Sequence, residues 1–382
     1  MRPVKILCVG ILFLGLMATN SSDAASPAKE QYKIGVCLAL TGPLAALGDP
    51  ELKGAKLAVE VINEKGGVHG RLIELIIEDD AGKPELSVVK GSKLITKDEV
   101  LGIFGGTTGD ACMAIASIAE KKKIPFISPT GFGGDEIQRG YKYNFLCIPD
   151  YDDAVEAIIK YAKAEFKCNR FGLLRLTRFW GVQASRAFHK FKNKYGIEVV
   201  REETCADGDK DFTPQLTNIK AAEPCAICIW ASAPAAQIAI KNARHLGISV
   251  PLLGNVVFAS KKTPEIAGEA AEGVIAAATM IWTDPLPRQQ EYVERFTRKY
   301  GMPPDMWDAM GYDGIMLFTK AIGSLPEAKV NRENIRGALE KIPIYEGASA
   351  IFKYSQLRWP IAESWIMISI KEGKFYRIPF KW

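Results

Sequence analysis

Hydrophobic and polar positions along this chain fall into blocks of two recurring kinds. The first kind is a short apolar run closed by a turn, such as Tyr32–Leu40 before Thr41-Gly42-Pro43, or Leu72–Glu78 before two aspartates. Strands covered on both faces have this near-continuous apolar character. The second kind is amphipathic, with apolar residues at helical spacing, as over Glu51–Lys65. Strands that alternate with helices in this way predict a parallel sheet with right-handed crossovers.

The alternation restarts near residue 148, which predicts a second domain, and 382 residues suit two domains of ordinary size. Further strands are expected over Leu101–Phe104, Pro125–Ser128, Tyr143–Ile148, Phe171–Arg175, Glu198–Glu202, Ala226–Trp230, Leu252–Leu253, Val274–Ala278 and Ala350–Tyr354. Further helices are expected over Pro84–Lys97, Gly109–Lys121, Asp150–Phe166, Trp180–Lys194, Asp211–Ala221, Ala233–Leu246, Pro287–Tyr300, Ala309–Ile322 and Asn331–Lys341. The chain closes with a predicted hairpin, Trp365–Ile370 and Phe375–Ile378, around a glycine turn.

The segment Leu101–Gly133 contains the strongest candidate for a binding site. Its first strand leads through two glycines and two threonines, Gly105–Thr108, directly into a predicted helix. The first backbone N–H groups of a helix are unpaired, and the helix dipole adds partial positive charge there. This arrangement suits a small anion such as a carboxylate or phosphate. The alternative is that Thr107 or Thr108 only caps the helix.

The N-terminus has the layout of a secretory signal peptide over residues 1–24. Arg2 and Lys5 precede the apolar run Ile6–Ala18, and the small-residue site Ser22-Asp23-Ala24 follows it. The run is shorter than the roughly 20 apolar residues of a transmembrane anchor. We therefore expect a soluble, exported protein.

The charge distribution argues against nucleic-acid binding, and the histidine positions argue against a metal site. The net charge of +5 is spread along the chain without a basic tract that carries interleaved aromatics, which argues against nucleic acid. His69, His189 and His245 are scattered, which argues against a metal site. We expect no cofactor.

Cysteine usage gives little support to redox chemistry. Seven of the eight cysteines lie beyond the signal segment, an odd number, so at least one has no intramolecular disulfide partner. Cys225 and Cys228 form a C-x-x-C pattern, but they fall inside a predicted strand. Positions three apart in a strand face opposite sides, whereas a redox pair normally lies at a helix start.

Several motifs in order carry a family resemblance. Residues 32–85, YKIGVCLALTGPLAALGDPELKGAKLAVEVINEKGGVHGRLIELIIEDDAGKPE, contain T-G-P-x-A, G-D, a G-A helix, I-N-x-K-G-G-V-x-G and a strand that ends in D-D. Later matches are IPFISPTG at 124–131, KDFT at 210–213 and PEIAGEAAEGV at 264–274. The chain thus resembles the branched-chain amino-acid (leucine/isoleucine/valine) binding proteins of bacterial ABC importers, the type I periplasmic binding proteins.

The resemblance implies an α/β fold of two doubly wound parallel-sheet lobes, joined by three crossings and closing on ligand like a hinge. We place the crossings near 148, 279 and 357, so that lobe one holds 25–148 and 280–357, and lobe two holds 149–279 and 358–382. The resemblance also implies a monomer in the periplasm without catalytic residues. Such a protein binds a small molecule and delivers it to an ABC permease in the inner membrane.

The resemblance further implies which positions hold the ligand. The ligand carboxylate would lie on Thr108 and Gly109 at the helix start, and on Thr130, Gly131 and Phe132 at the next strand end. The remaining pocket positions are Leu47, Trp180, Trp230, Ala235 and Trp307. Each tryptophan has the alternative of ordinary core packing.

Two departures from the family pattern bear on the ligand. Phe132 stands where a hydroxyl residue is common, and Ala235 stands where leucine-binding relatives place an acid for the ligand's ammonium group. A buried ammonium without an anionic partner is costly. The aromatic and apolar positions therefore indicate an aliphatic or aromatic carboxylate without an α-ammonium group. The alternative is that Asp305 or Asp308, beside Trp307, holds the ammonium of an amino acid.

Two other functions compete with transport. A ligand-sensing regulatory protein can use the same fold, although such proteins usually carry further domains or a membrane segment. An enzyme, such as a thiol oxidoreductase through Cys225 and Cys228, is disfavoured because no catalytic set of side chains accompanies it.

Overall fold

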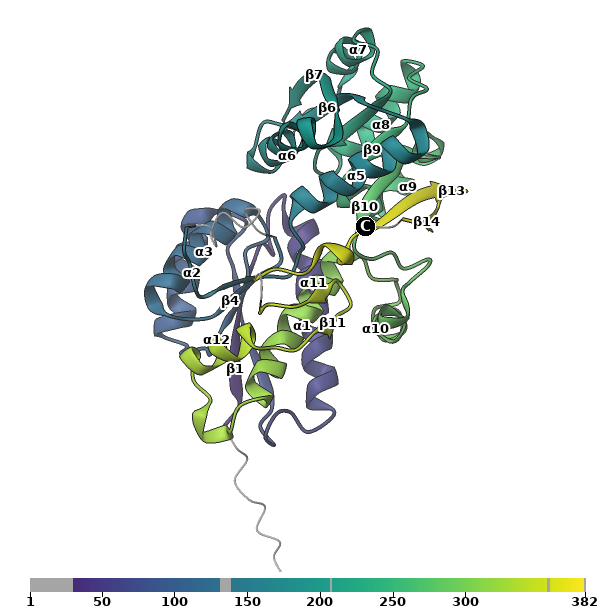
Figure 1. The fold of residues 1–382 in the computed structure, drawn as a ribbon. Coiled ribbons are helices and arrows are strands. Elements are labelled where there is room, and N and C mark those ends of the chain that lie inside the picture. The colour runs from purple at the N-terminus through teal and green to yellow at the C-terminus, as the bar shows by residue number, and fades with distance from the viewer. Residues whose placement is uncertain (1–29, 131–138, 207, 356–357, 381–382) are drawn as a thin grey trace, which may run out of the picture.

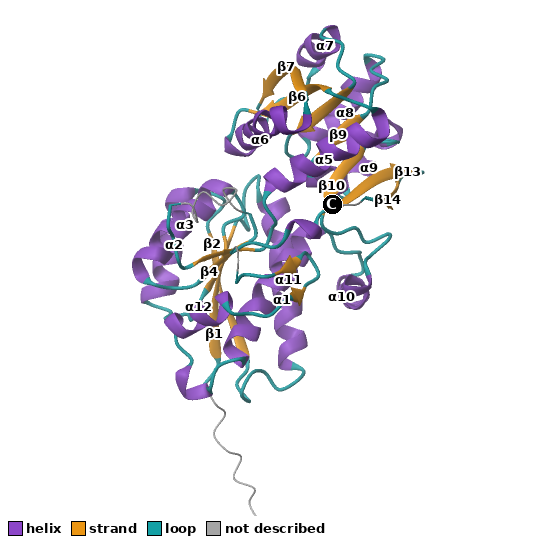
Figure 2. Cartoon of the chain, viewed as in Figure 1, coloured by secondary structure: helices purple, strands orange, loops and turns teal. Residues whose placement is uncertain are grey.

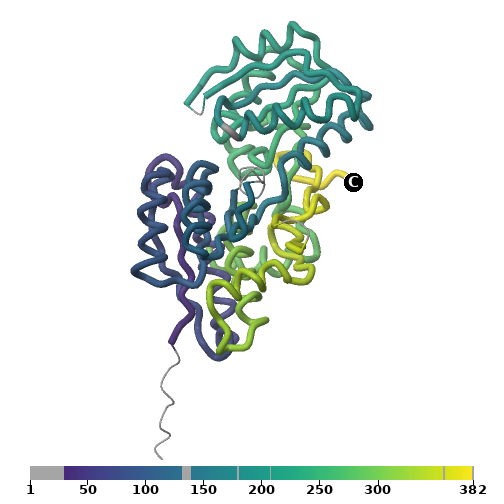
Figure 3. Tube along the Cα trace, turned by 60° about the vertical axis from the view of Figure 1, so that its left-hand side comes forward, coloured from purple at the N-terminus to yellow at the C-terminus, as the bar shows by residue number. Residues whose placement is uncertain are grey.

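The computed structural model describes residues 30–130, 139–206, 208–355 and 358–380, which form two α/β lobes (Figure 1). The predicted signal segment and the candidate site residues Gly131 and Phe132 lie outside the described residues. Figure 2 shows strands at the centre of each lobe with helices around them. The turned view in Figure 3 keeps the two lobes apart, with several chain segments passing between them.

The first lobe is built on a five-stranded parallel sheet of order β2-β1-β3-β4-β5. Its strands are β1 (Tyr32–Leu38), β2 (Ile73–Asp79), β3 (Ile103–Gly105), β4 (Phe126–Ser128) and β5 (Asn144–Leu146). Its helices are α1 (Ala45–Asn63), α2 (Pro84–Thr96), α3 (Gly109–Lys122), α10 (Pro287–Tyr300), α11 (Met306–Gly323) and α12 (Arg332–Glu340). A two-stranded sheet, β11 (Tyr345–Glu346) and β12 (Ile351–Phe352), follows α12.

Helices α1 and α11, far apart in sequence, pack closely together in the first lobe (Figure 1). A Cβ atom on Gly54 would lie 1.7 Å from the carbonyl oxygen of Asp308, and one on Gly311 would lie 1.9 Å from that of Glu51. Only glycine permits this approach of two helix backbones. Helix α11, which follows the second lobe in sequence, is thereby fixed to the N-terminal lobe.

The second lobe is built on a seven-stranded sheet of order β14-β13-β10-β9-β8-β6-β7. The parallel strands are β6 (Arg170–Leu176), β7 (Glu198–Cys205), β8 (Ala226–Trp230), β9 (Leu252–Gly254) and β10 (Ile275–Ala278). The hairpin of β13 (Ile366–Lys371) and β14 (Lys374–Ile378) adds antiparallel to β10. The helices are α5 (Tyr151–Phe166), α6 (Phe179–Tyr195), α7 (Thr213–Ala221), α8 (Ala235–His245) and α9 (Lys262–Ala267).

The predicted alternation of strands and helices is confirmed, and the differences lie at element ends. Helix α1 begins at Ala45, six residues before the expected start, because Pro50 is accommodated inside the helix at the loss of one backbone hydrogen bond. Helix α11 begins at Met306 instead of Ala309, because Asp305 caps it. The expected strand at 350–354 is only two residues long.

The chain passes from the first lobe to the second between β5 and α5, returns between β10 and α10, and crosses again between β12 and β13. The domain boundaries placed near 148, 279 and 357 stay a prediction. One buried apolar cluster includes residues of both lobes, among them Ile148, Tyr151 and Trp365. The connecting region therefore shares a continuous apolar core with both lobes.

Candidate functional site

Small and polar residues gather at the carboxyl edge of the first sheet. The parallel strands β1, β3 and β4 all end at this edge, and ligands of open α/β sheets bind outside such edges. The predicted anion site, Thr108 and Gly109, follows β3, and Ser128 and Thr130 lie at the end of β4. The topology thus brings these segments side by side.

The bend after β3 requires glycine. Gly105 has φ +154°, and a Cβ atom there would lie 2.0 Å from the carbonyl oxygen of Cys37. Gly106 has φ +79°, and a Cβ atom there would lie 2.7 Å from the Cα of Cys112. The bend is therefore packed between β1 and α3 with no room for a side chain.

Thr107 is fixed inside the lobe. Its Oγ1 donates to Glu51 Oε2 at 2.8 Å and accepts from the backbone N–H of Ala39 at 3.1 Å. Burial raises the pKa of Glu51 to about 8, although the hydrogen bond from Thr107 opposes the shift. Thr107 thus joins α1 to the bend, and it is Thr108 that starts the helix.

Thr108 caps α3, as the capping alternative states. Its side chain accepts from the N–H of Ala111 at 3.3 Å, and its backbone is extended. Thr108 and Gly109 are both partly exposed, while Asp110 in the same first turn is exposed. Capping uses one of the first N–H groups of the helix, and Gly109 supplies another. The cap and an anion site are compatible at this helix start.

Thr130 is tied to the same bend. Its Oγ1 donates to the carbonyl of Gly106 at 2.9 Å and lies 3.2 Å from Cys112 Sγ. Cys112 Sγ also lies 2.7 Å from Ser128 Oγ, and Ser128 Oγ donates to the carbonyl of Thr130. Thr130 keeps 9% of its surface exposed, so its hydroxyl serves first to hold the two strand ends together.

Tyr151, the first residue of α5, packs against two tryptophans of the second lobe. Its ring centroid lies 5.8 Å from that of Trp180 and 6.2 Å from that of Trp230, which lie 6.2 Å from each other. Burial, and then the nearby Cys112 thiol, raise the pKa of Tyr151. Tyr151 therefore packs against the aromatic residues at the carboxyl ends of β6 and β8.

The structure brings together some of the predicted pocket residues and buries others. Trp180 is partly exposed, whereas Trp230 is fully buried. Leu47 is partly buried on α1, and Trp307 on α11 keeps 9% exposure. Ala235 is fully buried in an apolar cluster of the second lobe.

Asp305 and Asp308 are engaged at the start of α11. Asp305 Oδ1 accepts from the N–H of Trp307 at 3.0 Å, and Asp308 Oδ2 accepts from the N–H of Asp305 at 2.8 Å. Lys261, from the second lobe, donates to the carbonyl of Pro303 at 2.9 Å, and its Nζ lies 3.9 Å from Asp308 Oδ2. Burial, and then Asp305, raise the pKa of Asp308. Sequence reasoning missed both Lys261 and the role of these acids as caps.

The cysteines follow a pattern that the sequence left open. Cys225 pairs with Cys168 in a disulfide, with Cα atoms 5.4 Å apart, and Cys228 is free and buried. The C-x-x-C pattern is therefore not a redox pair.

Over the described ranges, no three His, Cys, Asp or Glu side chains are grouped to hold a metal ion. None of the helices described is long and apolar enough to cross a membrane.

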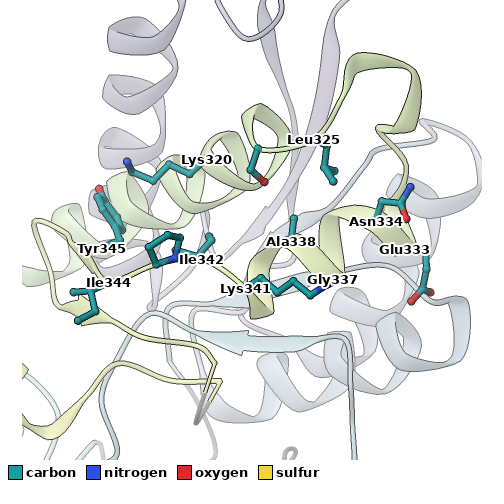
Figure 4. A pocket seen from close by; sticks show the side chains of 12 residues that line it. Lys320, Leu325, Glu333, Asn334, Gly337, Ala338, Lys341, Ile342, Ile344 and Tyr345 are labelled. Carbon is teal, nitrogen blue, oxygen red and sulfur yellow. The ribbon is translucent and has the colours of Figure 1, made fainter.

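A hollow of about 670 Å³ lies elsewhere in the first lobe, between α11, α12 and the segment that leads into β11 (Figure 4). Lys320, Lys341, Ile344 and Tyr345 are among its lining residues. None of the residues predicted to bind ligand lines it. The hollow is therefore separate from the candidate site at the strand ends.

A family model and a curated relative both match most of this chain to binding proteins. The family model described as periplasmic binding protein matches residues 31–367. A leucine-, isoleucine-, valine-, threonine- and alanine-binding protein from Pseudomonas aeruginosa is 25% identical over 312 residues, covering 82% of this chain and 83% of the relative.

Solved structures agree with that match. A leucine-binding protein from Thermotoga maritima has a TM-score of 0.80 at 26% identity, covering 91% of this chain and 97% of its own. A branched-chain amino-acid transporter substrate-binding protein from Streptococcus pneumoniae, in complex with isoleucine, has a TM-score of 0.80 at 24% identity. The match covers 91% of this chain and 99% of that protein, and at this identity it shows a shared fold.

Proposed function

Because the chain belongs to the periplasmic binding protein family, we propose that it binds a small apolar carboxylate between its two lobes and delivers it to an ABC permease. The observation that carries the proposal is the start of α3 at the carboxyl edge of the first sheet, where Thr108 and Gly109 supply donors for an anion. In the second lobe, the partly exposed Trp180 belongs to an aromatic cluster with Tyr151 and Trp230. A carboxylate with an apolar body matches both features.

The relatives support the class of function. The Pseudomonas aeruginosa relative is named for binding amino acids, and amino acids carry the carboxylate that the first-lobe edge suits. We place the protein in the periplasm as a monomer, with a cleaved signal over residues 1–24 and with an inner-membrane permease as its partner.

The ligand that we propose lacks an α-ammonium group. The segment 232–247, which contains all of α8, has no acidic residue, and Ala235 in it is fully buried. Asp308 is engaged with the backbone of Asp305 and with Lys261. An ammonium group entering such a site would lose its water and gain only neutral partners.

The carboxylate is tested first, by matched ligands. Isocaproate, which has the leucine skeleton without the amine, should raise the melting temperature and bind in titration calorimetry. Isocaproamide, which has the same body without the charge, should bind at least about tenfold more weakly, because it forms no charge-assisted hydrogen bonds at the helix start. Equal binding of acid and amide, or no binding by any apolar acid in a panel of chain lengths and rings, would refute the proposed function.

A further inference from the structure

The hollow between α11, α12 and the segment that leads into β11 takes no part in the proposed transport site (Figure 4). Its volume of about 670 Å³ lies within the range of roughly 300–1,000 Å³ that small-molecule sites occupy. Apolar side chains line it, among them Leu325, Ile342, Ile344 and Tyr345. Ile344 leaves 59% of its surface exposed, so part of this apolar lining faces solvent. The hollow therefore has the size and the lining to take up an apolar body.

The aromatic part of the lining is fixed from within the lobe. The Tyr345 hydroxyl donates to Oδ1 of the buried Asp313 at 3.1 Å, and the Tyr345 ring stacks on Phe352 with centroids 5.6 Å apart. Asp313 Oδ2 accepts in turn from the backbone N–H of Ser349 at 2.6 Å. This wall is preformed, as the walls of small-molecule sites usually are.

Two lysines that line the hollow have no carboxylate partner among the described residues. Lys320, in the last turn of α11, places its Nζ 4.7 Å from the centroid of the Tyr345 ring, and Lys341 caps the end of α12 and is exposed. Glu333 is the acid of the lining, and it accepts from the Tyr143 hydroxyl. Figure 4 places Lys320 and Tyr345 at one end of the hollow and Glu333 at the other. The Lys320 end is therefore open to an anionic group.

Gly337 leaves space in the hollow. It lies inside α12 among the lining residues, and a Cβ atom there would meet no heavy atom within 4 Å beyond its own helix. Glycine is a poor residue for a helix interior, and neither close packing nor a left-handed backbone requires it here. A longer side chain at this position would occupy part of the hollow. The sequence thus gives up helix stability at a place where it keeps the hollow open.

We propose that this hollow binds a small amphipathic anion. The apolar body of the ligand packs against Ile342, Ile344 and Tyr345, the anionic group pairs with Lys320, and Lys341 adds electrostatic attraction. An uncharged apolar ligand would leave the ammonium groups unused, and an inorganic anion would leave the apolar lining uncovered. The site lies within the first lobe alone, so it is a second site that does not depend on the ligand proposed between the lobes.

Titration calorimetry with octanoate, at a saturating concentration of isocaproate that occupies the site between the lobes, tests the inference. Octanoate should still bind, and octanamide should bind at least about tenfold more weakly because it lacks the charge. Gly337→Leu should abolish this binding by filling the hollow, and Lys320→Met should weaken it about tenfold. Lys56→Met is the control, because Lys56 is exposed on α1 and does not line the hollow.

Lysine acetylation by acetic anhydride, read by peptide mass spectrometry, locates the site in the wild-type protein. Octanoate should slow the acetylation of Lys320 and Lys341 and leave that of Lys56 unchanged. This measurement needs no substitution, so it remains decisive should Gly337→Leu fail to fold.

The outcomes separate this inference from the proposed function. It is overturned if octanoate does not bind, if Gly337→Leu and Lys320→Met bind it like wild type, or if octanoate leaves the acetylation of Lys320 unchanged. The two lysines would then serve only the helix dipoles at the ends of α11 and α12. None of these results touches the binding of isocaproate. If isocaproate fails to bind while octanoate protects Lys320, the proposed function fails and this inference stands.

Discussion

At the scale of single residues, the start of α3 carries the proposed carboxylate contact. Thr108→Val removes the hydroxyl that caps the helix and that we place on the ligand. We expect the variant to bind isocaproate about tenfold more weakly, and to lose on the order of 1 kcal/mol of unfolding free energy with the cap. Calorimetry measures the affinity and urea unfolding measures the stability.

Thr108→Ser is the matched control, since it keeps the hydroxyl and should stay near wild type in both measurements. A Thr108→Val protein that loses stability but binds isocaproate normally would show that the threonine only caps the helix.

Glu51 gives a second prediction at the residue scale, because its pKa is raised by burial to about 8 from an ordinary 4.5. The folded protein holds the Glu51 proton up to a higher pH than the unfolded chain does. The stability that depends on this neutral carboxyl is fully present below pH 4.5 and is lost as the pH rises through 8. Gln at this position stays neutral, so Glu51→Gln should gain stability relative to wild type between pH 5 and 8, on the order of a few kcal/mol.

Urea unfolding at several pH values measures that gain. Glu85→Gln, at an exposed acid of α2, is the control and should show no such trend. A difference between wild type and Glu51→Gln that stays constant from pH 5 to 8 would contradict a neutral, buried Glu51.

Part of the site could be predicted from residue patterns and part could not. Glycines and threonines after a buried strand indicate a helix start at a sheet edge, and the structure places Thr108 there. The burial of Glu51 and its bond to Thr107 join residues 56 positions apart, and no local pattern reports that. The contact of Lys261 with Pro303 likewise depends on how the two lobes meet.

At the scale of elements, the order of strands and helices followed from the hydrophobic pattern, while several boundaries depended on tertiary context. The helix expected from Glu51 begins at Ala45, because α1 continues through Pro50 and packs along α11. The cap at Asp305 was present in the sequence as an acid three residues before another acid, and it sets the true start of α11.

The disulfide gives a prediction at this scale, since Cys168 follows α5 and Cys225 precedes β8. The bond closes a sequence separation of 57 residues. The double variant Cys168→Ser/Cys225→Ser should lose about 2–4 kcal/mol of unfolding free energy, because the unfolded chain regains its freedom. Urea unfolding with and without a reducing agent measures this.

The wild-type protein should lose stability on reduction and the double variant should not, which separates the bond from the effect of the two substitutions. A wild-type protein that is indifferent to the reducing agent would contradict the pairing.

At the scale of the whole molecule, Lys261 bridges the two lobes through Pro303 and Asp308. If ligand binding is linked to closure, a contact between lobes favours the closed form and raises affinity. Lys261→Met should therefore weaken binding of isocaproate about three- to tenfold and increase the radius of gyration of the ligand-free protein in X-ray scattering.

Lys262→Met is the matched control, because Lys262 pairs with Glu265 within its own lobe and should leave both quantities unchanged. The role of the bridge would be refuted if Lys261→Met and Lys262→Met behaved alike.

The central claim concerns what the two lobes hold, and a comparison of isocaproate with leucine by titration calorimetry tests it most directly. The two ligands share a carboxylate and an apolar body and differ by the ammonium group, for which the fully buried Ala235 offers no charge. We predict that isocaproate binds well over tenfold tighter than leucine, since the unpaired ammonium would be desolvated without compensation. Tight binding of leucine that is lost in Asp308→Asn or Asp305→Asn would contradict the account and assign the site to amino acids.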